Sequence, residues 1–302
     1  MLAFSVVIPN LHSTFIDRTL ASLRAQDYDL SRVEVIVVGQ DRHGLIREDD
    51  LVRFDQSPDP LSPAVARNRG IEQASGDVVA LLDADCLASP TWLNTLARRY
   101  QDAEAHIVGG GVSFPSGNYW TICDNLSWFY EVLTDTPAGT RSHLPTLNLS
   151  LRREVFETVG GMDESFPRPA GEDTEWTTRM RLAGYELYFE PQAIVYHHHS
   201  RNTLKHVLEH AFHYGYNSVK VDPRYASTVG LPALLRNPLI LRIVAPVLGT
   251  GATARVFLKY AASKRHLQTA PAIFLTKLSW CLGAAQRLGD QQSKGAKTNA
   301  RE

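Results

Sequence analysis

The sequence predicts an α/β fold with a mostly parallel central sheet, followed by a C-terminal helical region. Short apolar runs alternate with amphipathic segments of about 12 residues, which is the pattern of repeated strand–helix–strand units. The run 78–82 is apolar at every position, as expected for a strand that helices cover on both faces. The chain has 302 residues, of which 44% are apolar, so it can bury a sizeable core.

The individual elements follow from the spacing of apolar residues. Phe15, Ile16, Leu20 and Leu23 recur at helical intervals, for example, and Pro63 stands near a helix start, where proline is tolerated. We predict strands at 4–8, 33–38, 51–54, 78–82, 106–112, 184–191 and 193–196, and helices at 14–26, 62–74, 90–100, 119–133, 172–182 and 204–219. The aromatic residues of 119–133 are interpreted as a core helix in preference to a sugar-binding platform.

Two carboxylates follow the apolar run 78–82. Alternation along an extended chain puts Asp83 and Asp85 on the same side, about 6–7 Å apart. Ligands of open α/β sheets bind at the carboxyl ends of strands, and a hard cation would relieve the repulsion between two acids. The pattern alone fits equally well a strand end whose acids are solvated in a loop.

Composition restricts the class of protein. Three cysteines, Cys86, Cys123 and Cys281, are widely spaced, which favours a reducing compartment over a disulfide framework or a zinc site. The N-terminus has no basic region before its first apolar run and is expected to be a strand, not a signal peptide. We therefore expect a cytoplasmic protein, and we expect no nucleic-acid partner.

The ordered motifs of residues 4–200 resemble those of family-2 glycosyltransferases, which have a Rossmann-like, type-A glycosyltransferase fold. The order is a strand with Pro at its end, a Val-Ile-Val-Val strand, an Ala-Arg-Asn-Arg-Gly helix, the Asp-Ala-Asp turn, a Glu-Asp pair and a histidine after a strand. The resemblance implies a site for a nucleotide-diphosphate sugar. The donor-binding residues that it implies are Pro9 and Asn10 under the base, Arg67 and Asn68 by the base and ribose, Asp83 near the ribose and Asp85.

One position departs from the family pattern. The family usually has an Asp-Asp pair after the second strand, whereas this chain has Gly39-Gln40, with Asp41 one residue later. A glutamine side chain both donates and accepts hydrogen bonds, so Gln40 can still meet the edge of a uracil base.

The resemblance also implies a divalent cation, Mn²⁺ or Mg²⁺, on the diphosphate. Asp85 is the first expected metal ligand and His197 the second, with His199 as the alternative histidine on the same face of an extended chain. Carboxylate and neutral imidazole suit these ions. The cation would stabilise the charge that grows on the diphosphate leaving group.

The Glu-Asp pair implies the catalytic residues. By resemblance, Asp173 is the base that deprotonates the acceptor hydroxyl as it attacks the anomeric carbon, which implies direct displacement and inversion. Glu172 and Glu175 are the alternatives, and Glu172, Asn148 and Trp176 are expected to bind the acceptor. From the residues alone, the acids fit simple capping of a helix N-terminus equally well.

The C-terminal region differs in charge from the rest of the chain. Residues 231–302 carry 11 Lys and Arg against 2 Asp and Glu, a net charge of +9, whereas residues 1–230 have a net charge of −10. This basic, amphipathic region is expected to lie on an anionic membrane surface, at the inner face of the cell membrane, with packing on the enzyme or a dimer contact as the alternatives. Its most apolar stretch, 238–249, is interrupted by Arg242 and Pro246 and is predicted to be too short to span a bilayer.

These expectations describe three regions and one activity. Residues 1–225 form the catalytic domain, 226–290 the basic helical region and 291–302 a disordered tail. The activity is inverting transfer of a sugar from a nucleotide-diphosphate donor, expected to be UDP-linked, to a hydroxyl of a glycan or lipid-linked acceptor.

Two other functions remain open. A sugar nucleotidyltransferase would normally carry a glycine-rich, basic phosphate loop near the first strand, and residues 9–13 lack one. A non-catalytic glycan- or partner-binding protein is the second alternative, and the Gly39-Gln40 departure is its best support.

Overall fold

The computed structural model describes residues 1–114, 117–166 and 171–299, and the chain forms two compact units. The first unit comprises Met1–Pro115, Glu131–Pro167 and Glu172–His199. The second comprises Ser116–Tyr130, Arg168–Gly171 and Ser200–Glu302. The sheet belongs to the first unit, and the second unit is helical.

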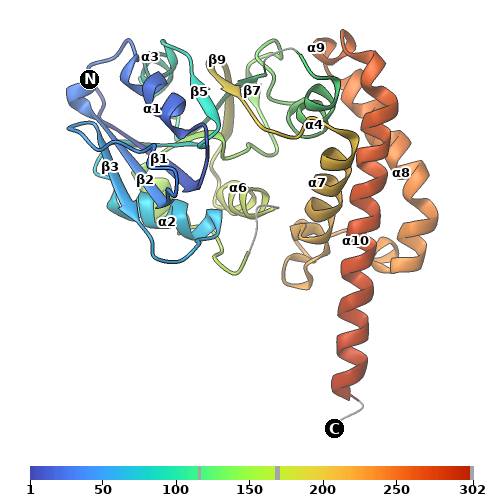
Figure 1. The fold of residues 1–302 in the computed structure, drawn as a ribbon. Coiled ribbons are helices and arrows are strands. Elements are labelled where there is room, and N and C mark those ends of the chain that lie inside the picture. The colour runs from blue at the N-terminus through green and yellow to red at the C-terminus, as the bar shows by residue number, and fades with distance from the viewer. Residues whose placement is uncertain (115–116, 167–170, 300–302) are drawn as a thin grey trace. The chain divides into compact units, whose positions relative to one another are not determined.

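Strands and helices alternate through much of the first unit (Figure 1), which confirms the predicted α/β class. Its strands are β1 (Phe4–Leu11), β2 (Val33–Gln40), β3 (Val52–Gln56), β4 (Val78–Leu82), β5 (Cys86–Ala88), β6 (Ile107–Ser113), β7 (Gly139–Thr140), β8 (Asn148–Arg152) and β9 (Leu187–His197). Its helices are α1 (Ile16–Arg24), α2 (Pro63–Gln73), α3 (Trp92–Arg99), α5 (Arg153–Val159) and α6 (Glu172–Leu182).

In the described part of the chain, nine strands form one sheet in the order β3-β2-β1-β4-β8-β6-β9-β5, with β7 paired to β9. Strands β1, β2, β3 and β4 are parallel, as are β6 and β9, and β8 runs antiparallel between β4 and β6. β4 is buried at all five positions, which explains its unbroken apolar sequence. Because parallel strands end at one edge of a sheet, the residues after β1, β2 and β4 gather at that edge.

The second unit is built from helices that pack through α10 (Ala270–Asn299). The others are α4 (Tyr119–Phe129), α7 (Leu204–Tyr216), α8 (Pro238–Lys259) and α9 (Ala261–Lys264). Ser127 Oγ of α4 lies 2.8 Å from Thr276 Oγ1 of α10, and the Lys277 ammonium lies 4.4 Å from the centre of the Trp128 ring. These contacts hold α4 in the helical unit, whose segments begin before residue 225, where we predict the division from the sequence.

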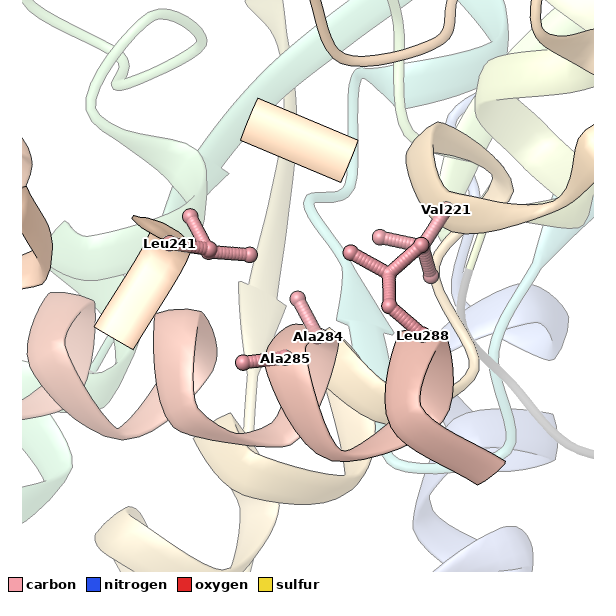
Figure 2. Close-up of a cluster of buried hydrophobic side chains, with 5 residues drawn as sticks. All are labelled: Val221, Leu241, Ala284, Ala285 and Leu288. Atoms are coloured by element: carbon pink, nitrogen blue, oxygen red, sulfur yellow. The ribbon is translucent and has the colours of Figure 1, made fainter. Parts of the chain in front are cut away.

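A small apolar cluster joins α8 to α10 (Figure 2). Leu241 of α8 packs with Ala284, Ala285 and Leu288 of α10 and with Val221. The buried residues of α8 recur every three or four positions, namely Leu241, Ala245, Gly249, Thr253, Val256 and Phe257. One face of α8 is therefore covered within the second unit.

The structure corrects two expectations about the C-terminal region. α8 continues through Pro246 for 22 residues, and an 18-residue window of it has mean hydropathy 1.4. By length and composition it is able to cross a membrane, a test that core helices of soluble proteins also pass. The sequence analysis underestimated the length of this apolar helix, which we predicted only for residues 238–249. A proline inside a helix kinks the helix without necessarily ending it. α10 is helical to Asn299, whereas we predicted a disordered tail from residue 291, and residues 300–302 lie outside the described residues.

Candidate active site

The Asp-Ala-Asp turn follows the central strand β4, as predicted. Two hydroxyls hold the turn through the carbonyl of Ala84, since Ser13 Oγ donates to it over 3.0 Å and Thr19 Oγ1 over 3.1 Å. The side chains of Asp83 and Asp85 are 30% and 34% exposed. The turn is therefore anchored from behind while both carboxylates stay accessible.

Asp85 lies beside the predicted histidine ligand. Strand β5 pairs antiparallel with β9, and Cys86 is the register partner of His197. His197 Nε2 is 3.7 Å from Asp85 Oδ2, and a ligand atom from each of Asp85, Cys86 and His197 lies within 4.8 Å of the others. His199, the alternative ligand, has its ring centre 5.0 Å from that of His197.

The donor set of this group fits a divalent cation. One carboxylate oxygen and one imidazole nitrogen converge, and both are ligand types that Mn²⁺ and Mg²⁺ accept. Burial raises the pKa of the Cys86 thiol well above its usual range, and the nearby Asp85 and Asp83 raise it further. The sequence analysis missed Cys86 here, although its place directly after Asp85 is a visible signal.

Arg67 connects the Asp-Ala-Asp turn to the Glu-Asp pair. Its Nη2 donates to Asp83 Oδ1 over 2.7 Å, and its Nη1 lies 3.3 Å from Glu172 Oε1. Burial opposes the charge of Arg67, but Asp83 and Glu172 outweigh it and raise the pKa of the guanidinium. Arg67 is buried, and its Nε has no hydrogen-bond partner among the described residues. Asp83, predicted on the donor side, and Glu172, predicted in the catalytic pair, come from separate motifs and are joined by the side chain of Arg67.

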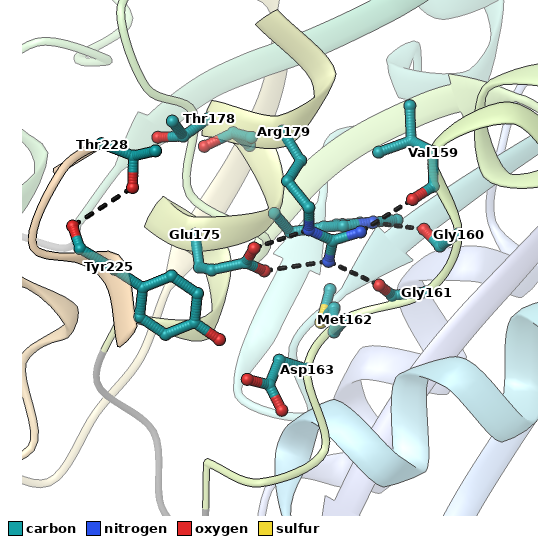
Figure 3. A network of polar contacts seen from close by, with 12 residues as sticks. Val159, Gly160, Gly161, Met162, Asp163, Glu175, Thr178, Arg179, Tyr225 and Thr228 are labelled. Carbon is teal, nitrogen blue, oxygen red and sulfur yellow. Dashed lines mark hydrogen bonds and ion pairs between the residues drawn. The ribbon is translucent and has the colours of Figure 1, made fainter. Parts of the chain in front are cut away.

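A second arginine, Arg179, forms an ion pair with Glu175. Arg179 Nε and Nη2 bind the two oxygens of Glu175 over 2.6 and 2.9 Å, and the same guanidinium donates to the carbonyls of Val159 and Gly161 (Figure 3). Glu175 is therefore a structural anchor of α6. This arrangement argues against its role as an alternative base.

Asp173 has a different environment from Glu172 and Glu175. Its Oδ1 accepts from the Thr174 backbone N–H over 2.7 Å, and its Oδ2 lies 3.6 Å from His143 Nε2. Its side chain is 14% exposed, whereas those of Glu172 and Glu175 are each 6% exposed. Among the acids in the first turn of α6, Asp173 alone forms no ion pair with an arginine in the described part of the chain. The sequence analysis missed His143, which no motif distinguishes from the other histidines.

The residues predicted to lie under the base occupy the ends of β1 and β2. Asn10 Nδ2 donates to the carbonyl of Gln40 over 2.7 Å, and Pro9 pairs with Val38. Gln40 Nε2 donates to the carbonyl of Pro58 over 2.8 Å. Gly39 has φ +134°, and a Cβ there would clash with the Asn10 carbonyl oxygen. The backbone at this position therefore requires glycine, where the family pattern usually has aspartate.

Three further predicted residues are buried and fully engaged with the protein. Asn68 donates to the Met162 carbonyl and accepts from the Met162 N–H. Asn148 accepts from the Trp92 indole and donates to two backbone carbonyls. Trp176 is 0% exposed and donates to the Gly160 carbonyl. In this structure the three side chains position neighbouring segments, and none of them presents a free polar atom to a ligand.

Comparisons with known proteins identify the family to which the chain belongs. A family model described as "Glycosyltransferase like family 2" matches residues 3–215. Glycosyltransferase AglE of Haloferax volcanii is 31% identical over 204 residues, which are 64% of this chain and 66% of AglE. The pre-mycofactocin glycosyltransferase of Mycobacterium tuberculosis is 26% identical over 259 residues, 82% of this chain and 53% of that protein. The matches thus span between about half and two thirds of the length of these curated relatives.

The fold is also found among solved structures. The mannosyltransferase PcManGT of Pyrobaculum calidifontis, solved in complex with GDP-Man and Mn²⁺, superposes with a TM-score of 0.57 at 18% identity, covering 91% of this chain and 86% of that one. This likeness supports the type-A glycosyltransferase fold that the sequence resemblance implied. Since the family model matches more than half of the sequence, the chain belongs to glycosyltransferase-like family 2.

Proposed function

We propose that this chain is an inverting, metal-dependent glycosyltransferase that uses a nucleotide-diphosphate sugar and has Asp173 as its base. The observation that carries the proposal is the division of roles within the first turn of α6. Arg67 forms an ion pair with Glu172 and Arg179 with Glu175, so within the described residues Asp173 is the acid of that turn that forms no ion pair with an arginine, although the charge of Arg67 still interacts with it. A base must be accessible and able to accept a proton, and an arginine partner makes a carboxylate a weaker base, so Asp173 meets these needs best of the three acids.

The chain's own residues then have distinct tasks. Asp173 takes the proton of the acceptor hydroxyl while the oxygen's electron pair forms the bond to the anomeric carbon. The bond from that carbon to the diphosphate oxygen breaks, and its electrons leave with the nucleoside diphosphate. Asp85 and His197 would hold a divalent cation, which when bound supplies positive charge for the departing diphosphate. Arg67 keeps Asp83 and Glu172 at a fixed separation across the site.

For the donor, we propose a UDP-sugar, with Asn10 and Gln40 near the base and Asp83 near the ribose. The support for uracil is the capacity of the Gln40 amide oxygen to accept a hydrogen bond from the base, since the Gln40 Nε2 already donates to the Pro58 carbonyl. For the acceptor, we propose a hydroxyl of a glycan or lipid-linked sugar. Asn68, Asn148 and Trp176 are proposed to shape the site from behind, because their polar groups are already used within the protein.

We also propose that the second unit lies on an anionic membrane surface. The support is an exposed apolar stripe on α8, where Leu239, Ile243 and Val247 are 63%, 68% and 73% exposed. Since the opposite face of α8 packs on α10, an interfacial position suits the helix better than lipid on all sides. The net charge of +9 in residues 231–302 supplies the attraction to anionic headgroups.

The experiment that tests the proposed function is thermal unfolding with a panel of nucleoside diphosphates, with and without Mn²⁺. Ligand binding to the folded state stabilises it by about 2.7 kcal/mol at a hundredfold excess over the dissociation constant. We expect UDP to raise the melting temperature only with Mn²⁺, and we expect D85A to lose the shift. No shift with any nucleotide, in folded protein, would favour the non-catalytic alternative.

The base is tested with D173N. We expect nucleotide binding to remain while release of nucleotide from a sugar donor falls at least about 100-fold, as for loss of a general base. Unchanged turnover in D173N would exclude Asp173 as the base. Arg179 is not a suitable control because it anchors α6, so L182S on the same helix, at a side chain that is 71% exposed, serves as the control.

A further inference from the structure

His143 contacts two successive turns of the helix that carries Asp173. Its Nε2 lies 3.6 Å from Asp173 Oδ2, and its Nδ1 lies 3.0 Å from Thr177 Oγ1. The Thr177 hydroxyl, one turn after Asp173, also donates to the Asp173 backbone carbonyl over 2.7 Å. All three residues belong to the first compact unit.

These contacts indicate which tautomer of a neutral His143 fits its surroundings. A threonine hydroxyl has one proton and a carbonyl oxygen only accepts, so the 2.7 Å contact with the Asp173 carbonyl uses the proton of Thr177. The Thr177 oxygen must then accept from His143, which puts a proton on Nδ1. A neutral imidazole with Nδ1–H has its lone pair on Nε2, and that lone pair faces the Asp173 carboxylate.

We propose that neutral His143 accepts the proton that Asp173 takes from the acceptor hydroxyl. A lone pair and an ionised carboxylate cannot hydrogen-bond to each other, whereas a protonated Asp173 can donate to Nε2. The contact is therefore made only as the base becomes protonated, and it favours the transition state over the ground state. The 3.6 Å separation exceeds a hydrogen bond, but catalytic hydrogen bonds are often long in the free enzyme and tighten with substrate.

The proton balance is complete without a further reactant. The acceptor oxygen loses its proton to Asp173, and Asp173 passes it to His143 Nε2, which forms an imidazolium beside a carboxylate. The electron pair of the acceptor oxygen forms the new glycosidic bond, and the nucleoside diphosphate carries away the pair of the broken bond. His143 touches no substrate in this scheme, so it is a positioning residue that acts through Asp173, and the inference rests on the proposed role of Asp173.

Protonation of His143 before the reaction would reverse its effect. An imidazolium would pair with the ionised Asp173 and make that carboxylate a weaker base. Two charged groups of α6, Asp173 and Arg181, face His143 or its loop. Arg141 belongs to the same loop as His143, and Arg67 is close enough to Asp173 to interact with its charge. We therefore expect the acidic side of the pH–rate profile to depend on His143, and H143Q to extend activity toward lower pH.

The test measures nucleotide release with water as the acceptor. The donor is whichever of UDP-glucose, UDP-N-acetylglucosamine and GDP-mannose gives the highest rate with Mn²⁺. We expect H143A to lower the rate about 10- to 100-fold, with unchanged nucleotide affinity and partial rescue by added imidazole. H143Q can still donate to Thr177 and serves as the second variant if H143A does not fold. H106A, which removes another histidine–carboxylate contact of the first unit, is the matched control and should have no effect.

A double variant separates the inference from the proposed function. If His143 acts through Asp173, H143A should cost nothing further in the D173N background. An equal loss in both backgrounds, or wild-type rates in H143A and H143Q, would overturn the role of His143 while leaving Asp173 as the base. Wild-type rates in D173N would overturn both.

Discussion

Arg67 Nη1 lies 3.3 Å from Glu172 Oε1, and both side chains are only 6% exposed. This contact joins α2 to the first turn of α6 and gives adjacent acids different chemistry. Glu172 is held by a buried cation, whereas Asp173 faces an imidazole. The Glu-Asp pair is thus a structural carboxylate followed by a candidate base.

Removing the guanidinium should destabilise the protein strongly. We expect R67M to lower the free energy of unfolding by about 3 kcal/mol, because it removes the buried guanidinium that forms an ion pair with the buried Glu172. Urea denaturation measures the loss. The double variant R67M/E172Q should recover part of the loss, since a neutral amide is cheaper to bury than a carboxylate. R69M, which removes the more exposed pair with Asp55, is the control and should cost about 1 kcal/mol or less. Equal losses in R67M and R69M would contradict the special position of Arg67.

The proposed cation site makes a separate prediction. We expect chelation by EDTA to abolish nucleotide release and added Mn²⁺ to restore it. D85N and H197Q should each weaken Mn²⁺ binding at least about tenfold, measured by electron paramagnetic resonance with UDP present. The control is H198Q, because the His198 ring stacks on Phe15 at 4.7 Å and is not a predicted ligand. If H198Q weakened Mn²⁺ binding as much as H197Q does, the ligand assignment would fail.

Gly39 should not tolerate a side chain. We expect G39A to cost about 3 kcal/mol, because φ is +134° and a Cβ would meet the backbone of the neighbouring strand, which cannot move aside easily. Gly44 is the matched control, since it also has positive φ, +63°, but open space around its Cβ position. G44A should cost about 1 kcal/mol, and thermal or urea unfolding compares the two. Similar costs would show that conformation alone, without the clash, constrains Gly39.

Glu34 should contribute a pH-dependent part of the stability. Burial acts to raise the pKa of Glu34, but hydrogen bonds from Ser5 and Ser75 outweigh it and lower the pKa below the usual 4.5. A carboxylate with a lowered folded-state pKa stabilises the fold above its unfolded-state pKa and loses that effect as the pH falls through the folded-state pKa. We expect E34Q to be about 1 kcal/mol less stable at pH 7.

The difference between wild type and E34Q should shrink as the pH is lowered below 4.5, since protonation removes the charge from both the folded and the unfolded chain. Urea denaturation at several pH values measures it. E72Q, at an exposed position of α2, is the control and should change stability by less than about 0.5 kcal/mol. A constant difference down to pH 3 would argue against the proposed cause.

The exposed stripe of α8 can be removed without touching the core of the second unit. We expect the triple variant L239S/I243S/V247S to fold normally and to lose flotation with vesicles that contain phosphatidylglycerol. Binding of the wild type should weaken as salt is added, because headgroup attraction is screened. L182S, on an equally exposed leucine of the first unit, should bind vesicles like the wild type. Undiminished flotation of the triple variant would contradict the interfacial role of α8.

The sequence by itself determined the fold class, the family and the order of the motifs. The apolar run of β4, the glycine near the end of β2 and the Asp-Ala-Asp turn are local features, and local periodicity and turn chemistry suffice to recognise them. The register partnership of Cys86 with His197 agrees with the predicted placement of Asp85 and the histidine segment, because both lie at strand ends. The end of α8 and the helical C-terminal segment of α10 were harder to predict from the sequence, since helix ends and proline kinks depend on packing more than on propensity.

Only the tertiary structure distinguished the three acids of α6. Their sequence context is the same helical turn, and helix capping explains all of them equally well. Arg67 reaches Glu172 from 105 residues earlier in the chain, and His143 reaches Asp173 from a loop before β8. The chemistry of each carboxylate depends on the charge and the hydrogen bonds that distant segments bring to it. Such contacts follow from the packing of strands and helices, which no local pattern in the sequence records.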